Sequence, residues 1–217
     1  MRLVVFDLDG TITHRDTLWP YIMGFLRRRR RSHLRLLKVI PAVAAFLLGR
    51  ADRGQLKAAL MRATLGGATR GEIEEWNRQF IPWVITHGSR AGALEAIQEH
   101  QRRGDVLVLM SASPDLYVPD LGRALGFAAT VCTGVSWGAD GRLEGSLATP
   151  NRRGQEKALC LTALKAQYPG LPTIAYGNAA SDLPHLLLSD EPRLVNASAR
   201  ARRSAAHLGV RPYALWR

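Results

Sequence analysis

The N-terminal strand and the acids behind it constrain the fold of this chain more than any other feature. Leu3–Phe6 is an uninterrupted apolar run with β-branched and aromatic members, which predicts a strand buried in a parallel sheet. Asp7 and Asp9 follow it and lead into Gly10 and Thr11. Ligands of parallel sheets bind just beyond the carboxyl ends of strands, so two acids here can act as nucleophile or metal ligand and as proton donor. An isolated pair of acids of this kind more often lies in a solvated turn. Whether Asp7 and Asp9 form a catalytic site therefore depends on the other motifs of the chain.

Further apolar runs alternate with helical patterns along the rest of the chain. Val106–Met110 and Thr173–Tyr176 predict buried strands, and Leu194–Val195 predicts a last short strand before a basic helical tail. Strands that alternate with helices indicate an α/β fold, here a Rossmann-like parallel sheet with helices on both faces.

Residues 17–85 interrupt this alternation. They show about four helical patterns and no convincing strand, so we expect an all-helical cap inserted after the first strand. Residues 1–16 and 86–217 then form the core.

Local capping and turn signals predict several boundaries. The expected features are an N-cap at Asp52 for a helix ending near Leu65, a capping box at Thr69 and Glu72, an N-cap at Ser113 with Pro114 opening a helix to about Leu125, and a hairpin joining strands at Ala129–Val135 and Arg142–Ala148.

Composition narrows the class of protein. A chain of 217 residues with 47% hydrophobic content can build one domain with a large insert or two modest domains. Cys132 and Cys160 lie far apart without metal-ligand spacing, so neither a disulfide framework nor a zinc site is expected. This cysteine usage favours a reducing, cytoplasmic location. Because the chain enters its first strand at once, we also expect no signal peptide.

The net charge of +12 is concentrated in two stretches. Residues 27–38, including the run Arg27–Arg31, hold seven basic residues and no acid, and residues 193–217 hold six arginines and no acid. Clustered positive charge favours a polyanionic partner, either nucleic acid or an anionic membrane surface on which the protein would be peripheral. A solvated helix end is the alternative for Arg27–Arg31.

The segment Leu34–Leu48 is mostly apolar but too short to cross a membrane. It has fifteen residues, interrupted by Arg35, Lys38 and Pro41, whereas a spanning helix needs about 20 apolar residues. The segment can lie on a membrane surface instead.

Candidates for phosphoryl-transfer chemistry follow the later strands. The hydroxyl of Ser111 and the amides after it, beginning with Ala112, can donate to phosphate oxygens, although the same residues alone favour a plain helix cap. Lys157 lies early in a helix, where a lone lysine is usually solvated, and its own surroundings in the sequence do not single it out. Asn178 and Asp182 follow the third strand and carry the oxygen ligands that Mg²⁺ prefers.

The motif from Asp7 to Thr11 resembles the first motif of the haloacid dehalogenase superfamily, and the other candidates match its later motifs in order. The resemblance implies that Asp7 is the nucleophile and forms an aspartyl phosphate, with Asp9 as general acid and base. The implied phosphate-binding residues are Thr11, Ser111, Ala112 and Lys157, and the implied Mg²⁺ site comprises Asp7, Asp9, Asn178 and Asp182.

One position departs from the commoner family pattern. Asn178 stands where most members carry an aspartate, which removes a negative charge and should weaken metal binding. We expect Asp182 to orient a metal-bound water rather than to bind the ion directly. A catalytically inactive relative is the weaker alternative, because all the other motif positions are present.

The inserted helices resemble the C1-type cap of the phosphoserine phosphatase-like branch, subfamily IB. The arginines, the apolar segment and the Pro150–Lys157 stretch look similar to phosphatidylglycerophosphatase C-like proteins, which implies a lipid phosphate such as phosphatidylglycerophosphate as substrate. A soluble metabolite such as phosphoserine or histidinol phosphate is the alternative. A nucleic-acid-binding module is least favoured, because no binding motif accompanies the arginines. The sequence leaves the oligomeric state open.

Overall fold

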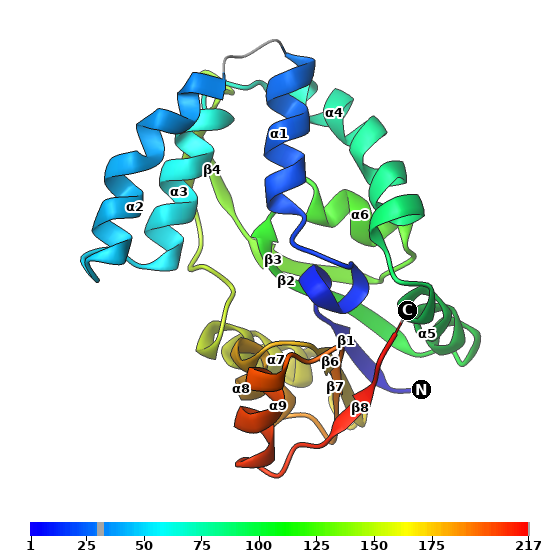
Figure 1. Ribbon diagram of the computed structural model, residues 1–217. Helices are drawn as coiled ribbons and strands as arrows, with labels where there is room; N and C mark the ends of the chain where they lie inside the picture. Colours follow the sequence, from blue (N-terminus) through cyan, green and yellow to red (C-terminus); the bar gives the residue numbers. More distant parts are fainter. Residues whose placement is uncertain (30–32, 217) are drawn as a thin grey trace.

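The computed structural model of the protein describes residues 1–29 and 33–216. A six-stranded sheet forms its centre, with the strand order β3-β2-β1-β6-β7-β8 and parallel pairing throughout (Figure 1). The strands of this sheet are β1 (Leu3–Phe6), β2 (Val106–Pro114), β3 (Ala129–Thr133), β6 (Thr173–Gly177), β7 (Glu191–Val195) and β8 (Pro212–Ala214). The predicted Rossmann-like α/β fold is therefore confirmed.

Both faces of the sheet are covered by helices, as alternate side chains of β1 show. Leu3 and Val5 pack in an apolar cluster with α7, α8 and α9, whereas Val4 and Phe6 pack with α5 and α6 on the other face. These helices are α5 (Ala91–Arg102), α6 (Val118–Ala124), α7 (Gln155–Gln167), α8 (Leu183–Leu186) and α9 (Ala199–Ala206).

The described part of the segment between β1 and α5 consists of helices joined by turns and lies above the carboxyl edge of the sheet (Figure 1). Its elements are the short helix η1 (Leu8–Ile12), α1 (Leu18–Arg28), the 3-10 helix η2 (His33–Val39), α2 (Ile40–Leu47), α3 (Arg53–Thr64), α4 (Arg70–Trp83) and η3 (Val84–Gly88). The predicted caps of α3 and α4 are present: Asp52 accepts from the amide of Gln55, and Thr69 exchanges hydrogen bonds with Glu72.

This helical group is not isolated from the core. Tyr21, Ile22 and Met61 share one buried cluster with Val4 and Phe6 of β1. The antiparallel hairpin of β4 (Val135–Trp137) and β5 (Leu143–Leu147) packs on α3. The division into a core and a cap at residues 17–85 remains a prediction.

The predicted helix start at Ser113 is wrong. Strand β2 continues through Ser111 to Pro114, where it still pairs with Thr133 of β3, and α6 begins only at Val118. The hydroxyl of Ser113 donates to Asp9 rather than capping a helix, because β2 delivers it beside the end of β1.

Two other boundaries differ from expectation. The run predicted as one hairpin strand at 129–135 divides at Gly134: its first part joins the main sheet as β3, and β4 alone forms the hairpin with β5. The basic tail is not only helical, because after α9 the chain adds β8 to the sheet edge. Both differences arise from strand pairing between segments that are distant in the sequence, which short sequence patterns do not encode.

Within the described residues, no helix is long and apolar enough to cross a membrane. The expectation that Leu34–Leu48 does not span a bilayer agrees with this finding.

Candidate active site

Asp7 lies where β1 ends and the chain turns into η1, and its side chain is 6% exposed. Its Oδ2 accepts a hydrogen bond of 2.8 Å from the Thr11 hydroxyl, and its Oδ1 lies 2.5 Å from Nζ of Lys157. Burial, offset in part by the Lys157 ammonium, raises the pKa of Asp7 to about 7. A cation in the cavity would favour the ionised carboxylate that nucleophilic attack requires.

Lys157 projects from the first turn of α7 and is buried between two carboxylates. Besides Asp7 it contacts Oδ1 of Asp182 at 2.7 Å. Burial would lower its pKa, but the two carboxylates outweigh this effect and raise it. Lys157 is therefore a permanent cation, as the resemblance implied, and not a solvated helix residue.

Asp182 fixes Lys157 in place. Its Oδ2 accepts from the backbone amides of Asn178 and Ala179, so both carboxylate oxygens have partners. Burial would raise the pKa of Asp182, but Lys157 and these amides outweigh it and the pKa is lowered. That Asp182 orients a metal-bound water remains a prediction.

Asp9 faces the same space from η1 and is held by hydroxyl donors. Oδ1 accepts from the amide and the hydroxyl of Thr17, each at 2.7 Å, and Oδ2 accepts from Ser113 at 2.7 Å. Burial, followed by the charge of Asp16, raises the pKa of Asp9. A carboxyl group with a raised pKa suits the part of a proton donor.

Asn178 meets the end of β1 from the loop after β6. The Thr11 hydroxyl lies within hydrogen-bond distance of both Asp7 Oδ2 and Asn178 Oδ1, at 2.8 and 3.3 Å, so these oxygens converge. Gly10 permits this approach: its φ is +84°, and a Cβ there would lie 2.2 Å from Asn178 Nδ2.

These oxygens fit a magnesium ion, although no three His, Cys, Asp or Glu side chains of the described residues form a metal-binding group. Mg²⁺ usually takes one or two carboxylates and completes its shell with water and substrate phosphate. Asp7 and Asn178 can supply oxygen ligands of this kind. The ion would neutralise charge on the phosphoryl group.

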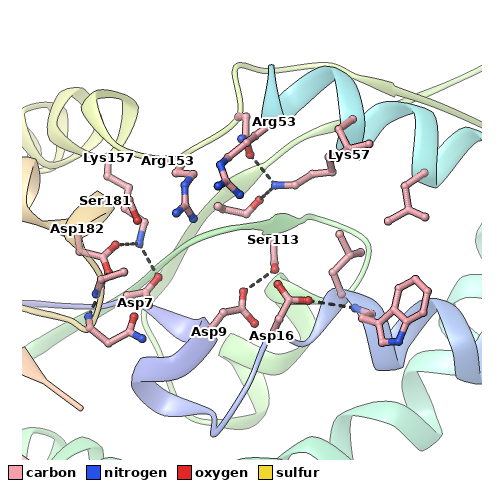
Figure 2. A pocket seen from close by; sticks show the side chains of 18 residues that line it. Asp7, Asp9, Asp16, Arg53, Lys57, Ser113, Arg153, Lys157, Ser181 and Asp182 are labelled. Carbon is pink, nitrogen blue, oxygen red and sulfur yellow. Dashed lines mark hydrogen bonds and ion pairs between the residues drawn. The ribbon is translucent and has the colours of Figure 1, made fainter. Parts of the chain in front are cut away.

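A cavity of about 360 Å³ opens in front of these residues, with Asp7, Asp9, Lys157 and Asp182 on one side (Figure 2). We call these four residues the floor. Across the cavity lie three cations, Arg53 and Lys57 of α3 and Arg153 of the loop before α7, which we call the roof.

The roof cations were not singled out from the sequence as site residues. Lys57 Nζ donates to the carbonyl of Ala112 at 2.5 Å and to Asn151 Oδ1 at 2.6 Å, and burial lowers its pKa to about 8. Arg53 and Lys57 are one helical turn apart on α3, a spacing that places two cations on one helix face. This spacing is the sequence feature from which Arg53 and Lys57 could have been identified as site residues.

The structure places most of the predicted site residues together. Asp7, Asp9, Ala112, Lys157, Asn178 and Asp182 line the cavity, and Thr11 bonds to two of them. The buried Ser111 does not line it: its hydroxyl accepts from the Ser113 amide and lies 3.5 Å from Asp9 Oδ2. Ser113 faces the cavity in its stead.

Known proteins are similar to this chain in sequence and in fold. The family model of the haloacid dehalogenase-like hydrolases matches residues 4–187. Protein CicA of Caulobacter vibrioides is 34% identical over 87% of this chain and 83% of its own length. A histidinol-phosphatase of Neisseria meningitidis is 26% identical, with 96% of each chain covered.

Two solved structures show the same fold. A protein of unknown function from Bordetella pertussis superposes with a TM-score of 0.80 at 22% identity, covering 98% of this chain and 97% of its own. A phospho-aspartyl intermediate analogue of phosphoserine phosphatase superposes with a TM-score of 0.66 at 17% identity, covering 99% and 92%. The chain therefore belongs to the haloacid dehalogenase-like hydrolases and is a phosphatase of that family.

Proposed function

We propose that the protein is a Mg²⁺-dependent phosphomonoester hydrolase that works through a phosphorylated Asp7. The observation that carries this proposal is the buried contact series Asp7–Lys157–Asp182 at the carboxyl end of β1, open to the cavity on one side. Phosphoryl transfer depends mainly on positioning and charge neutralisation, and this arrangement provides both.

The chemistry divides into two steps. A carboxylate oxygen of Asp7 attacks phosphorus and the bond to the ester oxygen breaks, while Asp9 gives its proton to the departing alkoxide. Asp9, now ionised, then takes a proton from a water molecule, which attacks the aspartyl phosphate and releases inorganic phosphate. Lys157 holds positive charge beside the phosphoryl group in both steps.

The three cations of the roof favour a substrate whose leaving group carries negative charge. Arg53, Lys57 and Arg153 have no acidic partner within the described residues, so an anionic group of a substrate can bind them. Leu18, Trp19, Leu56 and Leu60 add apolar surface to the same cavity.

Two substrate classes remain proposals. The lipid phosphate is the first, because an apolar and basic surface of η2 and α2 lies next to the cavity-lining helix α3. The soluble phosphate is the second, because a similar protein is a histidinol-phosphatase and the structural neighbours include phosphoserine phosphatase.

Phosphate release by the purified protein tests the proposal. We expect hydrolysis of an aryl phosphate with Mg²⁺, loss of activity with a chelator, and loss by more than about 10⁴-fold in Asp7→Asn, as when other hydrolases lose a nucleophile. Mass spectrometry of acid-quenched enzyme should locate the phosphoryl group on the Asp7 peptide. Substantial turnover by Asp7→Asn would rule out the aspartyl phosphate. A panel of phosphatidylglycerophosphate, phosphoserine and histidinol phosphate then separates the two substrate classes.

A further inference from the structure

Elements η2 and α2 carry an exposed apolar surface. Six large apolar side chains are 40% or more exposed: Leu34, Leu37, Ile40, Val43, Leu47 and Leu48. Helix α2 buries none of its residues. Isolated exposed apolar residues are ordinary, but a contiguous set of this size indicates an interaction site.

Five of the six side chains form one stripe because of their spacing, and Leu48 follows Leu47 directly at the end of α2. In the 3-10 helix η2, residues three apart are eclipsed, which aligns Leu34 with Leu37. In α2, positions three, four and seven apart share a face, which continues the stripe from Ile40 through Val43 to Leu47. We call these six residues the apolar stripe.

Only positive charge accompanies the stripe in the sequence. Residues 17–51 contain eight arginines and lysines and no aspartate or glutamate. Lys38 and Arg50 are exposed beside the stripe, and neither has an ion pair within the described residues. A second copy of this chain, with a net charge of +12, would bring like charges together here.

The arginine run contributes less than its sequence suggests. Arg28 and Arg29 form ion pairs with Glu75 and Glu72 of α4, and Arg30 and Arg31 lie outside the described residues. Helix α9, which carries Arg200, Arg202 and Arg203, lies at the opposite end of the molecule (Figure 1). The two basic stretches therefore do not form one patch.

We propose that the apolar stripe docks on an anionic lipid bilayer, with Lys38 and Arg50 at the headgroups. Leucine side chains enter the acyl boundary and flanking cations bind anionic headgroups, the pattern of interfacial helices. The proposal deepens the proposed function: Arg53 of the roof lies over the ring of Phe46 in α2, at 5.6 Å from its centroid, so the docked surface adjoins the cavity.

Vesicle sedimentation of the full chain tests docking. Wild type should bind vesicles of phosphatidylglycerol and phosphatidylcholine, release partly at high salt, and ignore pure phosphatidylcholine. The triple variant Leu37→Ser, Leu47→Ser and Leu48→Ser should bind at least about tenfold more weakly, because it loses the inserting side chains. The matched control is Leu188→Ser, Leu208→Ser and Leu215→Ser, which removes three exposed leucines outside the stripe and should bind as wild type does.

Other outcomes overturn the proposal. Equal vesicle binding by the stripe variant and the control, or no binding by wild type, contradicts docking through this surface. Light scattering that shows a wild-type dimer and a monomeric stripe variant, without vesicle binding, assigns the stripe to a second copy. Aryl phosphate hydrolysis should be equal in all three proteins, and its absence from wild type would refute the proposed function and leave the vesicle result standing.

Discussion

The floor and the roof of the cavity both carry charge, but within the described residues only the floor contains ion pairs. Lys157 is 2% exposed and contacts two carboxylates, at 2.5 and 2.7 Å. Arg53 and Arg153 are exposed and, like Lys57, contact no carboxylate within the described residues. Buried charges must be paired, and that pairing fixes the geometry needed for chemistry. Exposed cations without acidic partners remain available to a ligand.

Because of this difference, we expect substitutions in the floor and in the roof to change different kinetic constants. Changes in the floor should lower kcat, since they alter groups that act in the transition state. Changes in the roof should raise KM, since they remove contacts to a part of the substrate that does not react. Three measurements test this contrast and a fourth tests the metal site; they are ordered by expected effect.

The largest effect is expected for Asp9→Asn. The variant lacks the carboxyl that gives and takes a proton, so kcat should fall by about 10²–10⁴-fold, with little change in KM. Ser181→Ala is the control, because Ser181 lines the cavity but has no assigned proton transfer. The loss should be smaller for an aryl phosphate with a good leaving group, which needs no proton. An equal loss for all leaving groups would contradict the role of Asp9 as acid.

The next effect is expected for Lys57→Met. Loss of a charge-assisted hydrogen bond of about 1.5–3 kcal/mol should raise KM for an anionic substrate by tenfold or more and leave kcat within a few-fold. Lys165→Met, on the exposed part of α7, is the control. A fall in kcat with unchanged KM would remove the distinction between roof and floor.

The effect of pH on kcat/KM through Lys57 of the roof should be smaller than the effect of Lys57→Met. The pKa of Lys57 is lowered to about 8 because the side chain is buried, so Lys57 is charged below that pH and neutral above it. We therefore expect kcat/KM for an anionic substrate to decline several-fold as pH rises through about 8. Lys57→Arg, which remains charged, should shift this decline to higher pH or abolish it. An unchanged profile would show that Lys57 does not contact the substrate.

The smallest effect is expected for Asn178→Asp. A carboxylate at this position would add negative charge beside Asp7, so the Mg²⁺ concentration for half-maximal activity should fall several-fold. The titration is done with the chelator-treated enzyme. An unchanged midpoint would mean that Asn178 does not bind the ion.

Parts of the fold and site that depend on local chemistry were predictable. The apolar run Leu3–Phe6 encodes a central strand, since every one of its side chains is buried. The caps at Asp52 and Thr69 involve residues three positions apart, so the sequence pattern contains the whole interaction. The motif acids Asp7 and Asp9 lie at the sheet edge because parallel strands present their carboxyl ends together.

The sequence by itself thus determined the family, the parallel sheet and the floor of the cavity. Tertiary structure decided the rest, because contacts between distant segments have no local pattern. Lys57 reaches Ala112 and Asn151 only when α3 lies over the end of β2, and Ser113 meets Asp9 only because β2 continues past Met110. Strand β8 forms only where β7 offers an edge. Burial of a backbone edge or a charge requires a partner, and that partner comes from the fold rather than from neighbouring residues.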